Sequence, residues 1–423
     1  MDSCLPNPPR STGARSWLVG AALLLACGIP AAHAELCALD DVPAATLLVP
    51  YFEVDLATCG STNTLVTVLN TVPDNTLVYV TLWTDWGQPT IGFHMYLTGY
   101  DVETIDLGAA FCDGSLPVTG PTVSNHGNLS DPPGAPSSCD SIFPFPDPVI
   151  FGTLLDRLRN GHTGQPHFTF DGFCAGQDYD DDIARGYLTI DVVTDCQLVF
   201  PTEPGYFDGI AALDNILLGE VVETGPLGTF AQPVVHLEAD EGFSFFAPGD
   251  HTFYGRLVDG QATDRREPLG TTYGMPLVGD PAATELVVWR EHFGGNTATC
   301  GESPSGLPLP QQAILAFDHE ENPSLIPANL GLVTQAVALD PAFPEFGWAF
   351  FDERHNGPQT LYQDDLAQAW VGHRTTLAGS PSRLGRGSAV FEAACSGASV
   401  VLPTIFNDGF ESGDTSSWSS TQF

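Results

Sequence analysis

Three aspartates at alternating positions are the residues of this sequence best suited to hold a metal ion. Asp178, Asp180 and Asp182 would supply carboxylate oxygens at positions one, three and five of a calcium loop, and Ca²⁺ prefers such hard ligands. Position six is Ile183 where the sharp turn needs Gly, and position twelve is Thr189 where a bidentate Glu belongs. The full motif fails, so a looser calcium site and a solvated acidic loop stay open as alternatives, and calcium is the only cofactor suggested.

Histidine and serine motifs for catalysis are incomplete. His162 and His167 lie five residues apart in a Gly/Pro-rich stretch, but the spacing fixes no third ligand for zinc. The sequence holds no G-x-S-x-G nucleophile motif and no H-E-x-x-H zinc motif. We therefore leave the catalytic residues unknown and expect ordinary loop histidines here.

Acidic pairs and aromatic side chains are compatible with action on glycans. Glu238 with Asp240, and Asp318 with Glu320, would share one face of a strand, and glycosidases use paired carboxylates. Such pairs also arise by chance in a chain with 52 acidic residues. Trp86 lies in a turn and is the tryptophan that we most expect to be exposed, where it would stack on a sugar; burial in a core is the alternative.

The cysteines indicate an oxidising compartment. An even number of cysteines in an exported chain predicts disulfides, and no C-x-x-C redox or zinc motif is present. The eight candidates beyond the N-terminal segment are Cys37, Cys59, Cys112, Cys139, Cys174, Cys196, Cys300 and Cys395. Spacing does not determine connectivity, and we expect nearest-neighbour pairing: 37–59, 112–139, 174–196 and 300–395.

Residues 1–34 have the features of a signal peptide. Arg10 and Arg15 precede an apolar run over residues 17–29, which is shorter than the roughly 20 residues a membrane span needs. Ala-His-Ala at 32–34 predicts cleavage before residue 35. Lipidation of Cys27, within a lipoprotein-like Leu-Leu-Ala-Cys stretch, is the alternative. We expect a secreted or cell-surface protein with no transmembrane anchor after cleavage.

The charge of the chain comes from missing cations. Asp and Glu number 52, Lys and Arg together number 13, all of them Arg, and the net charge is −39. This composition excludes nucleic-acid binding through a basic surface. The 43 % share of hydrophobic residues is enough to build a core, so the chain should fold. Adaptation to high salt is a further hypothesis, weakened by the ordinary share of acidic residues.

Hydrophobic alternation predicts a mainly β fold. Runs over residues 64–69, 76–83, 91–97 and 102–107 are separated by turns every eight to twelve positions, which is typical of an antiparallel β-sandwich. Ile91, Phe93, Met95 and Leu97 should form one buried face. We predict an immunoglobulin-like sandwich over residues 44–110 and a larger β-rich region with one or two short helices. No fixed-period repeat is visible.

One short helix carries start and stop signals. Asp147 and Pro148 are expected to begin it, Arg157 and Arg159 to occupy its last turn, and Gly161 to end it. The predicted organisation is a signal peptide (1–34), a sandwich domain (35–110), a Pro/Gly/Ser-rich loop with the helix (111–165), a β-rich domain (166–398) and a polar tail (399–423).

Two stretches carry resemblances. The YFEVDL (51–56), LWTDWG (82–87) and YLTGYDV (96–102) segments resemble an uncharacterised family of exported bacterial β-rich proteins, a resemblance that would cover most of the mature chain and implies no known activity. The DGFESGD stretch at 408–414, with Trp418, resembles a closing tail of secreted bacterial proteins. This resemblance implies a sorting or processing tag, beside the alternative of a frayed end.

These observations favour an exported, non-enzymatic structural or binding protein, extracellular or surface-associated. Its partner would be a glycan or a component of a cell surface. A secreted hydrolase that acts on glycans through paired carboxylates is the alternative.

Overall fold

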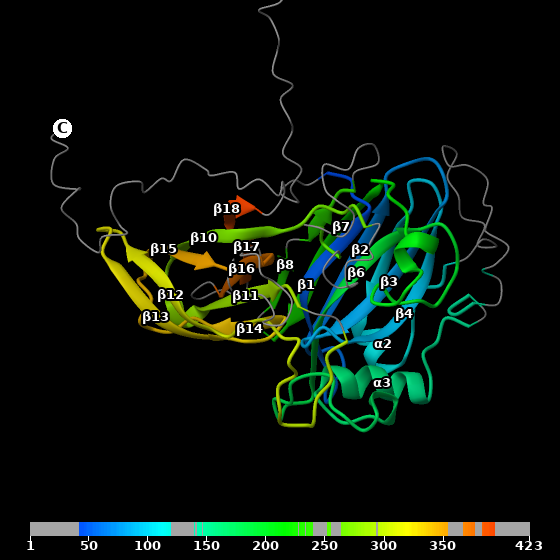
Figure 1. Cartoon of the computed structure of the whole chain (residues 1–423), viewed down its shortest axis with the longest axis horizontal. Helices are drawn as coiled ribbons and strands as arrows, with labels where there is room; N and C mark the ends of the chain where they lie inside the picture. The colour runs from blue at the N-terminus through cyan, green and yellow to red at the C-terminus, as the bar shows by residue number, and fades with distance from the viewer. Residues whose placement is uncertain are drawn as a thin grey trace, which may run out of the picture. The chain divides into compact units, whose positions relative to one another are not determined.

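The structure, a computed structural model, describes residues 42–119, 139, 142–145, 147–226, 228–232, 234–239, 252–254, 264–292, 295–353, 367–376 and 383–393. All of them belong to one compact unit of the chain. The predicted signal peptide and tail, together with Cys27, Cys37 and Cys395, lie outside these residues. Within the described part, no helix is long and apolar enough to cross a membrane. The mainly β class is confirmed (Figure 1).

The first nine strands form two antiparallel sheets, which we call repeat 1. One sheet has the order β4-β3-β6-β1-β9 and the other has the order β5-β2-β7-β8. Side chains of both sheets share one apolar core, so the sheets pack face to face. The strands are β1 (Thr46–Asp55), β2 (Asn63–Asn70), β3 (Thr76–Thr84), β4 (Pro89–Leu97), β5 (Val102–Asp106), β6 (Ile183–Val193), β7 (Leu217–Gly225), β8 (Gly228–Gln232) and β9 (Val235–Leu237).

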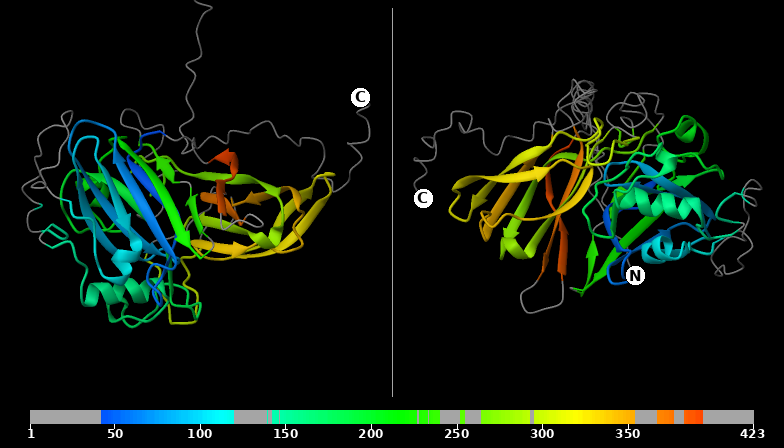
Figure 2. Two further views of the ribbon diagram at one scale, coloured as in Figure 1. Left: turned by 180° about the vertical axis from the view of Figure 1, so that it is seen from behind. Right: turned by 90° about the horizontal axis from the view of Figure 1, so that it is seen from below.

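The last nine strands form a second pair of antiparallel sheets, repeat 2, drawn in yellow-green to orange in Figure 2. Their orders are β13-β12-β15-β10-β18 and β14-β11-β16-β17, and they enclose a core of their own. The strands are β10 (Gly270–Val278), β11 (Thr284–Arg290), β12 (Gln311–Asp318), β13 (Pro323–Leu330), β14 (Thr334–Ala338), β15 (Phe346–Asp352), β16 (Ala369–Thr376), β17 (Arg383–Gly387) and β18 (Ala389–Ala393).

The two repeats have the same topology. Adding nine to each strand number of repeat 1 reproduces both sheet orders of repeat 2, and every pair of neighbouring strands is antiparallel in both. The chain is therefore an internal structural duplication. The sequence did not predict it, because the two halves share a pattern of faces and turns rather than a fixed period.

Strand register identifies equivalent residues. In repeat 1, Trp83 of β3 pairs with Tyr187 of β6 and with Pro89 of β4. In repeat 2, Phe317 of β12 pairs with Trp348 of β15 and with Pro323 of β13. A four-residue turn separates the aromatic residue's strand from the proline in both hairpins, at residues 85–88 and 319–322. Trp83 thus corresponds to Phe317, and Tyr187 corresponds to Trp348.

Two glycines support this equivalence. Gly186 precedes Tyr187, and Gly347 precedes Trp348. A Cβ atom at Gly186 would collide with the backbone carbonyl of Trp83, and one at Gly347 would collide with the carbonyl of Phe317. Each repeat therefore needs a glycine at the same place, where neighbouring strands approach most closely.

The predicted buried face of β4 is confirmed, and the opposite face is buried as well. Ile91, Phe93, Met95 and Leu97 are at most 5 % exposed and pack in the core of repeat 1. The alternating residues between them, such as His94, are equally buried. Both faces of this sheet are buried, whereas an alternating apolar and polar sequence predicts that one face is exposed to solvent.

The predicted immunoglobulin-like sandwich of residues 44–110 does not stand alone, and its immunoglobulin-like character is not confirmed. Strand β6 lies between β3 and β1, β7 pairs with β2, and β9 pairs with β1, so strands between residues 183 and 237 complete both sheets. Both sheets of repeat 1 therefore extend beyond residue 110. Sheet order depends on contacts between distant segments, which local alternation does not encode.

The helices also differ from the prediction. Helix α3 (Thr153–His162) begins after Gly152, not at Asp147, because the chain before it is extended and Ile150 N–H donates to the Gly114 carbonyl. Helix α2 (Leu107–Cys112) was not predicted; the Asp106 side chain caps it by accepting from the Ala109 amide. Three short helical turns occupy Phe168–Phe170, Tyr206–Ile210 and Pro281–Ala283.

Disulfide bonding is confirmed, but the nearest-neighbour pairing is wrong at every bridge that it proposed. The structure joins Cys59 to Cys112, Cys139 to Cys196, and Cys174 to Cys300. Each of the four expected pairs includes at least one of these six cysteines. Sheet pairing explains the first bridge: Cys59 precedes β2 and Cys112 follows β5, and these two strands are neighbours. The third bridge joins the two repeats.

Candidate functional site

The outer face of the five-stranded sheet of repeat 1 is covered by residues of repeat 2. Trp83 and Tyr187 stack there with ring centroids 5.6 Å apart, and both are at most 1 % exposed. Trp289 of repeat 2 meets Tyr187 edge-on at 5.9 Å, and the Tyr187 hydroxyl lies 2.6 Å from Nε2 of His292. The stacked pair is therefore part of the junction between the repeats.

The hairpin turn between β3 and β4 anchors the junction. The carbonyl of Asp85 accepts from the Val333 amide at 3.0 Å, and the carbonyl of Trp86 accepts from the Asn296 side chain at 2.7 Å. Trp86, predicted to be exposed, is 2 % exposed. The turn is buried because repeat 2 packs on it, a tertiary contact that turn residues in the sequence cannot reveal.

The Asp85 side chain is buried at this junction. Its Oδ1 accepts from the Gln177 amide at 3.0 Å. Burial raises the pKa of Asp85 to about 7, although the Gln177 hydrogen bond and the charge of Arg185 act in the opposite direction. The carboxyl group therefore titrates near neutral pH.

Arg374 of repeat 2 sits among three carboxylates. Its guanidinium donates to Glu285 at 2.6 Å, to Glu223 at 2.7 Å and to Glu53 at 3.3 Å. Burial acts to raise the pKa of Glu53, but Arg374, the Tyr51 hydroxyl and Arg185 together lower it. Glu53 and Glu223 line a small cavity of about 190 Å³, where they compensate a buried cation.

A second arginine joins the segment before β10 to repeat 1. Arg266 is fully buried and bonds Asp191 at 3.3 Å and Asp264 at 3.1 Å. Burial raises the pKa of Asp191, a shift that Arg266 opposes. Tyr206 and Tyr254 donate hydrogen bonds to the same carboxylate. The junction thus combines buried ion pairs, at Arg374 and at Arg266, with the aromatic contacts of Trp83, Tyr187 and Trp289.

In repeat 2 the equivalent sheet face is apolar and partly exposed. We call it the β15 face; its members alternate along β15 or pair with it through β10, β12 and β13. Phe317 and Trp348 stack with centroids 4.5 Å apart, as their counterparts do in repeat 1. Phe346 is 55 % exposed. The face consists of Val278, Leu315, Phe317, Leu325, Phe346, Trp348 and Phe350.

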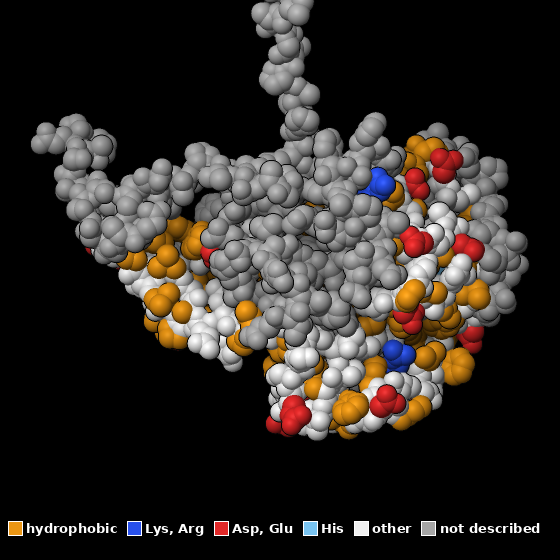
Figure 3. All heavy atoms as spheres, in the orientation of Figure 1, with side chains coloured by type: hydrophobic (Ala, Val, Ile, Leu, Met, Phe, Trp, Pro, Cys, Tyr) orange, Lys and Arg blue, Asp and Glu red, His pale blue; other side chains and the backbone are white. Residues whose placement is uncertain are grey.

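Exposure distinguishes the two faces. Leu325 and Val278 are 72 % and 69 % exposed, and Trp348 is half-buried where Tyr187 is fully buried. Figure 3 shows hydrophobic side chains gathered over the part of the molecule that carries β12, β13 and β15. An exposed contiguous apolar patch on a folded protein indicates an interaction site.

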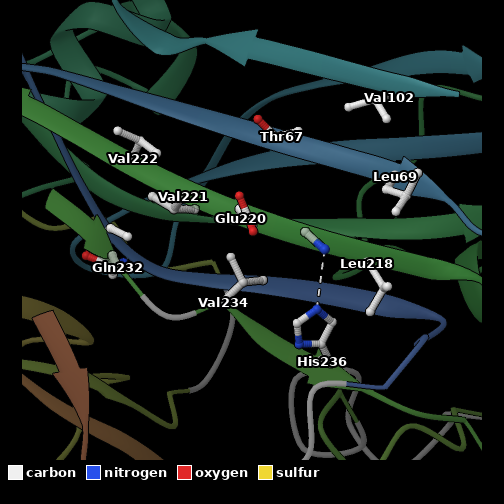
Figure 4. A pocket seen from close by; sticks show the side chains of 12 residues that line it. Thr67, Leu69, Val102, Leu218, Glu220, Val221, Val222, Gln232, Val234 and His236 are labelled. Carbon is white, nitrogen blue, oxygen red and sulfur yellow. Dashed lines mark hydrogen bonds between the residues drawn. The ribbon is translucent and has the colours of Figure 1, made fainter. Parts of the chain in front are cut away.

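A groove of about 730 Å³ lies on the four-stranded sheet of repeat 1 (Figure 4). Leu69 of β2, Val102 of β5 and Leu218 of β7 line it side by side. Glu220 is exposed at its centre, and His236 accepts through Nε2 from the Gly219 amide at 3.3 Å. The groove is mostly apolar, with one exposed carboxylate.

The predicted calcium ligands lie in an exposed loop before β6. Asp178 accepts from the Gln165 side chain at 2.9 Å and from the Asp180 amide at 2.9 Å. Among the residues with described positions, no group of three or more His, Cys, Asp or Glu side chains is placed to hold a metal ion. The geometry adds no support to the calcium site at Asp178, Asp180 and Asp182, which stays a prediction.

Among the described residues, the predicted histidines and Asp318 make local contacts of their own. His162 is buried between Thr90 and the Arg185 carbonyl, and burial lowers its pKa to about 4. His167 bonds the nearby Thr169 instead. Asp318 bonds the backbone of its own turn, and Asp240 lies outside the described residues.

The features now most suggestive of function, the β15 face and the groove, were not predicted as sites. The sequence Phe-Gly-Trp-Ala-Phe-Phe at 346–351 predicts only a strand. Its signal was the run of three aromatic residues at alternate positions, which occupies the face opposite to the core residue Phe351. No family model, curated protein or solved structure matches this chain, so its function has to be argued from this geometry.

Proposed function

We propose that this is an exported structural or binding protein, extracellular or surface-associated, that acts by association rather than by catalysis. The β15 face carries the proposal. It presents Phe346, Leu325 and Val278 to solvent beside Phe317 and Trp348, the counterparts of the Trp83–Tyr187 pair that the junction buries in repeat 1. A fold that buries one copy of a face and exposes the other has a surface suited to a partner.

Three observations support export. Residues 1–34 have the composition of a signal peptide, three disulfides cross-link the described chain, and no described helix could span a membrane. Disulfides persist in oxidising compartments outside the cytosol. Removal of the signal before residue 35 would release a chain ready for disulfide formation.

The glycan-hydrolase alternative receives less support. Glu53 and Glu223 meet in a cavity, and both are bonded to Arg374. The lowered pKa of Glu53 makes it unsuitable as the general acid that such a pair needs, and Glu223, the other member, is bonded to the same guanidinium at 2.7 Å. The pair is better suited to holding the junction together than to proton transfer.

Fractionation of cultures of the native host tests the proposal. The exported wild-type protein should be recovered largely in the sedimentable fraction, attached to cell surfaces or to large assemblies. Phe346→Asp places a charge in the exposed apolar surface and should shift the protein into the supernatant, read by immunoblot.

Phe151→Asp is the matched control, because Phe151 is 69 % exposed and lies before α3, outside the β15 face. It should behave as wild type. Equal distribution of wild type and Phe346→Asp, with both chains folded and oxidised, would contradict association through this face. Release of reducing sugars from a polysaccharide by the purified wild type would favour the hydrolase.

A further inference from the structure

The junction inside the chain has two different sides. Repeat 1 contributes the outer face of its five-stranded sheet, with Trp83 and Tyr187 at the centre. Repeat 2 contributes the end of β11, the start of β14 and the start of β16, through Trp289, Leu332 and Trp370. One aromatic cluster contains both sides. The contact is heterologous, since the repeats use non-equivalent surfaces.

Each of the two surfaces in this contact has an equivalent surface on the other repeat. The β15 face of repeat 2 is the equivalent of the covered face of repeat 1, as the strand register shows. The other side also has an equivalent, on the four-stranded sheet of repeat 1. Trp289 pairs with Thr334 and Trp370, and Leu69 pairs in the same way with Val102 and Leu218.

This equivalent surface is apolar as well. Val102 is 56 % exposed, and Tyr100, two residues before β5, is 49 % exposed. Tyr100 corresponds to Leu332, which lies two residues before β14. We call Leu69, Tyr100, Val102 and Leu218 the β5 patch; three of them line the 730 Å³ groove. The patch therefore combines exposed apolar side chains with a concave surface.

We propose that copies of this protein associate head to tail, with the β5 patch of one copy on the β15 face of the next, in a contact that repeats the one between repeat 1 and repeat 2. The inference rests on the proposed function, for which it names the partner. Equivalence with the junction supports a second copy as the occupant, because the chain already pairs two surfaces of these kinds within itself. A heterologous contact of this kind leaves one surface of each kind exposed at the ends and so permits chain growth.

Net charge gives the association a recognisable salt dependence. The full chain carries a formal charge of −39, and nearly all of its acidic residues lie beyond residue 34, so copies repel at low ionic strength. Salt screens that repulsion, while burial of the apolar surfaces is not weakened by it. Association should therefore strengthen between about 0.02 and 0.5 M NaCl, opposite to the response expected if attraction between charges held the copies together.

Two variants and their mixture test the proposal on the purified, oxidised mature protein. Phe346→Asp alters only the β15 face, and Val102→Asp alters only the β5 patch; both side chains are more than half exposed, so both variants should fold. Sedimentation velocity of the wild type should show a concentration-dependent series of species. Each variant alone should associate at least about thirtyfold more weakly.

An equimolar mixture of the two variants distinguishes head-to-tail association from a symmetric dimer. Phe346→Asp keeps an intact β5 patch and Val102→Asp keeps an intact β15 face, so an equimolar mixture should form one-to-one dimers that cannot grow. Phe151→Asp should associate as wild type does. A symmetric dimer through the β15 face alone predicts normal dimers for Val102→Asp and no rescue on mixing, and that result would overturn the proposal.

The outcomes also separate this inference from the proposed function. A wild-type chain that stays monomeric at high concentration and high salt would overturn head-to-tail association. If Phe346→Asp still lost its sedimentable fraction in the host, the β15 face would then bind a different partner and the proposed function would stand. If Phe346→Asp changed neither the association of the purified protein nor its sedimentable fraction in the host, both head-to-tail association and the proposed function would be contradicted.

Discussion

At the scale of single residues, the junction between the repeats is built from buried groups that the sequence alone does not mark. In the sequence, nothing distinguishes Asp85, Arg374 and Arg266 from the other charged residues. Each becomes nearly inaccessible because residues more than 50 positions away pack on it. Their partners are fixed by the fold, so neither their burial nor their pKa shifts could be predicted beforehand.

Asp85→Asn should stabilise the protein more at pH 8 than at pH 5. The folded pKa of Asp85 is about 7, while an unfolded Asp has a pKa of about 4. Between these values the folded chain holds a proton that the unfolded chain has lost, so the stability contributed by this group falls as pH rises towards 7. Asn is neutral throughout and can still accept from the Gln177 amide.

Thermal unfolding at the two pH values measures this difference. We expect the melting temperature of Asp85→Asn, relative to wild type, to rise by about 3 °C from pH 5 to pH 8. Asp178→Asn, in the exposed loop before β6, is the control and should show no such trend. A pH-independent difference for Asp85→Asn would show that the carboxyl group does not titrate near neutrality.

At the scale of elements, the sequence predicts strands well and their partners poorly. Strands β2, β3 and β4 fall close to their predicted ranges because alternation of apolar residues is a local property. The placement of β6 between β3 and β1 depends on chain closure over about a hundred residues. The cysteine pairing failed for the same reason, since Cys59 and Cys112 meet only once β2 and β5 have paired.

The Cys174–Cys300 bridge should stabilise the contact between repeats more than either repeat. It closes a loop of 126 residues and lies beside a backbone pairing of Cys174 with Ala298. Replacing both cysteines by Ser should cost about 2–4 kcal/mol. Because the bridge crosses the junction, we expect calorimetry to resolve one cooperative transition into two, one for each repeat.

The Cys59–Cys112 bridge provides the comparison, since both of its cysteines belong to repeat 1. Replacing both of these cysteines by Ser should lower the melting temperature. The two repeats should then still unfold together, or repeat 1 should unfold first. If loss of Cys174–Cys300 lowered stability without separating the transitions, the junction would hold through its aromatic and ionic contacts alone.

At the scale of the whole molecule, one topology is used twice and its surfaces are used differently. On β6, Thr189 and Tyr187 differ in polarity and are covered, whereas the equivalent positions on β15 carry Phe350 and Trp348; the next position in each column is an aspartate, Asp191 on β6 and Asp352 on β15. Mixed polarity suits a permanent internal contact in which each group has a partner. An apolar pair beside exposed Phe346 suits a contact made after folding.

The duplication also explains what the sequence could and could not indicate about function. The composition and the missing catalytic motifs favoured a binding or structural protein, and that proposal now has a location. The location itself follows only from comparing equivalent faces, which requires the strand register of both repeats. The resemblance of the 51–102 segments to exported β-rich proteins stays a prediction.

Hydroxyl-radical footprinting of the wild-type protein at low and high concentration measures side-chain exposure at both surfaces in one experiment. Head-to-tail association predicts that oxidation of Phe346 and of Tyr100 falls together as concentration rises, while oxidation of Phe151 stays constant. Unchanged oxidation at both positions, in a sample that still associates, would contradict head-to-tail contact between the β5 patch and the β15 face. Protection of Phe346 alone would contradict it too.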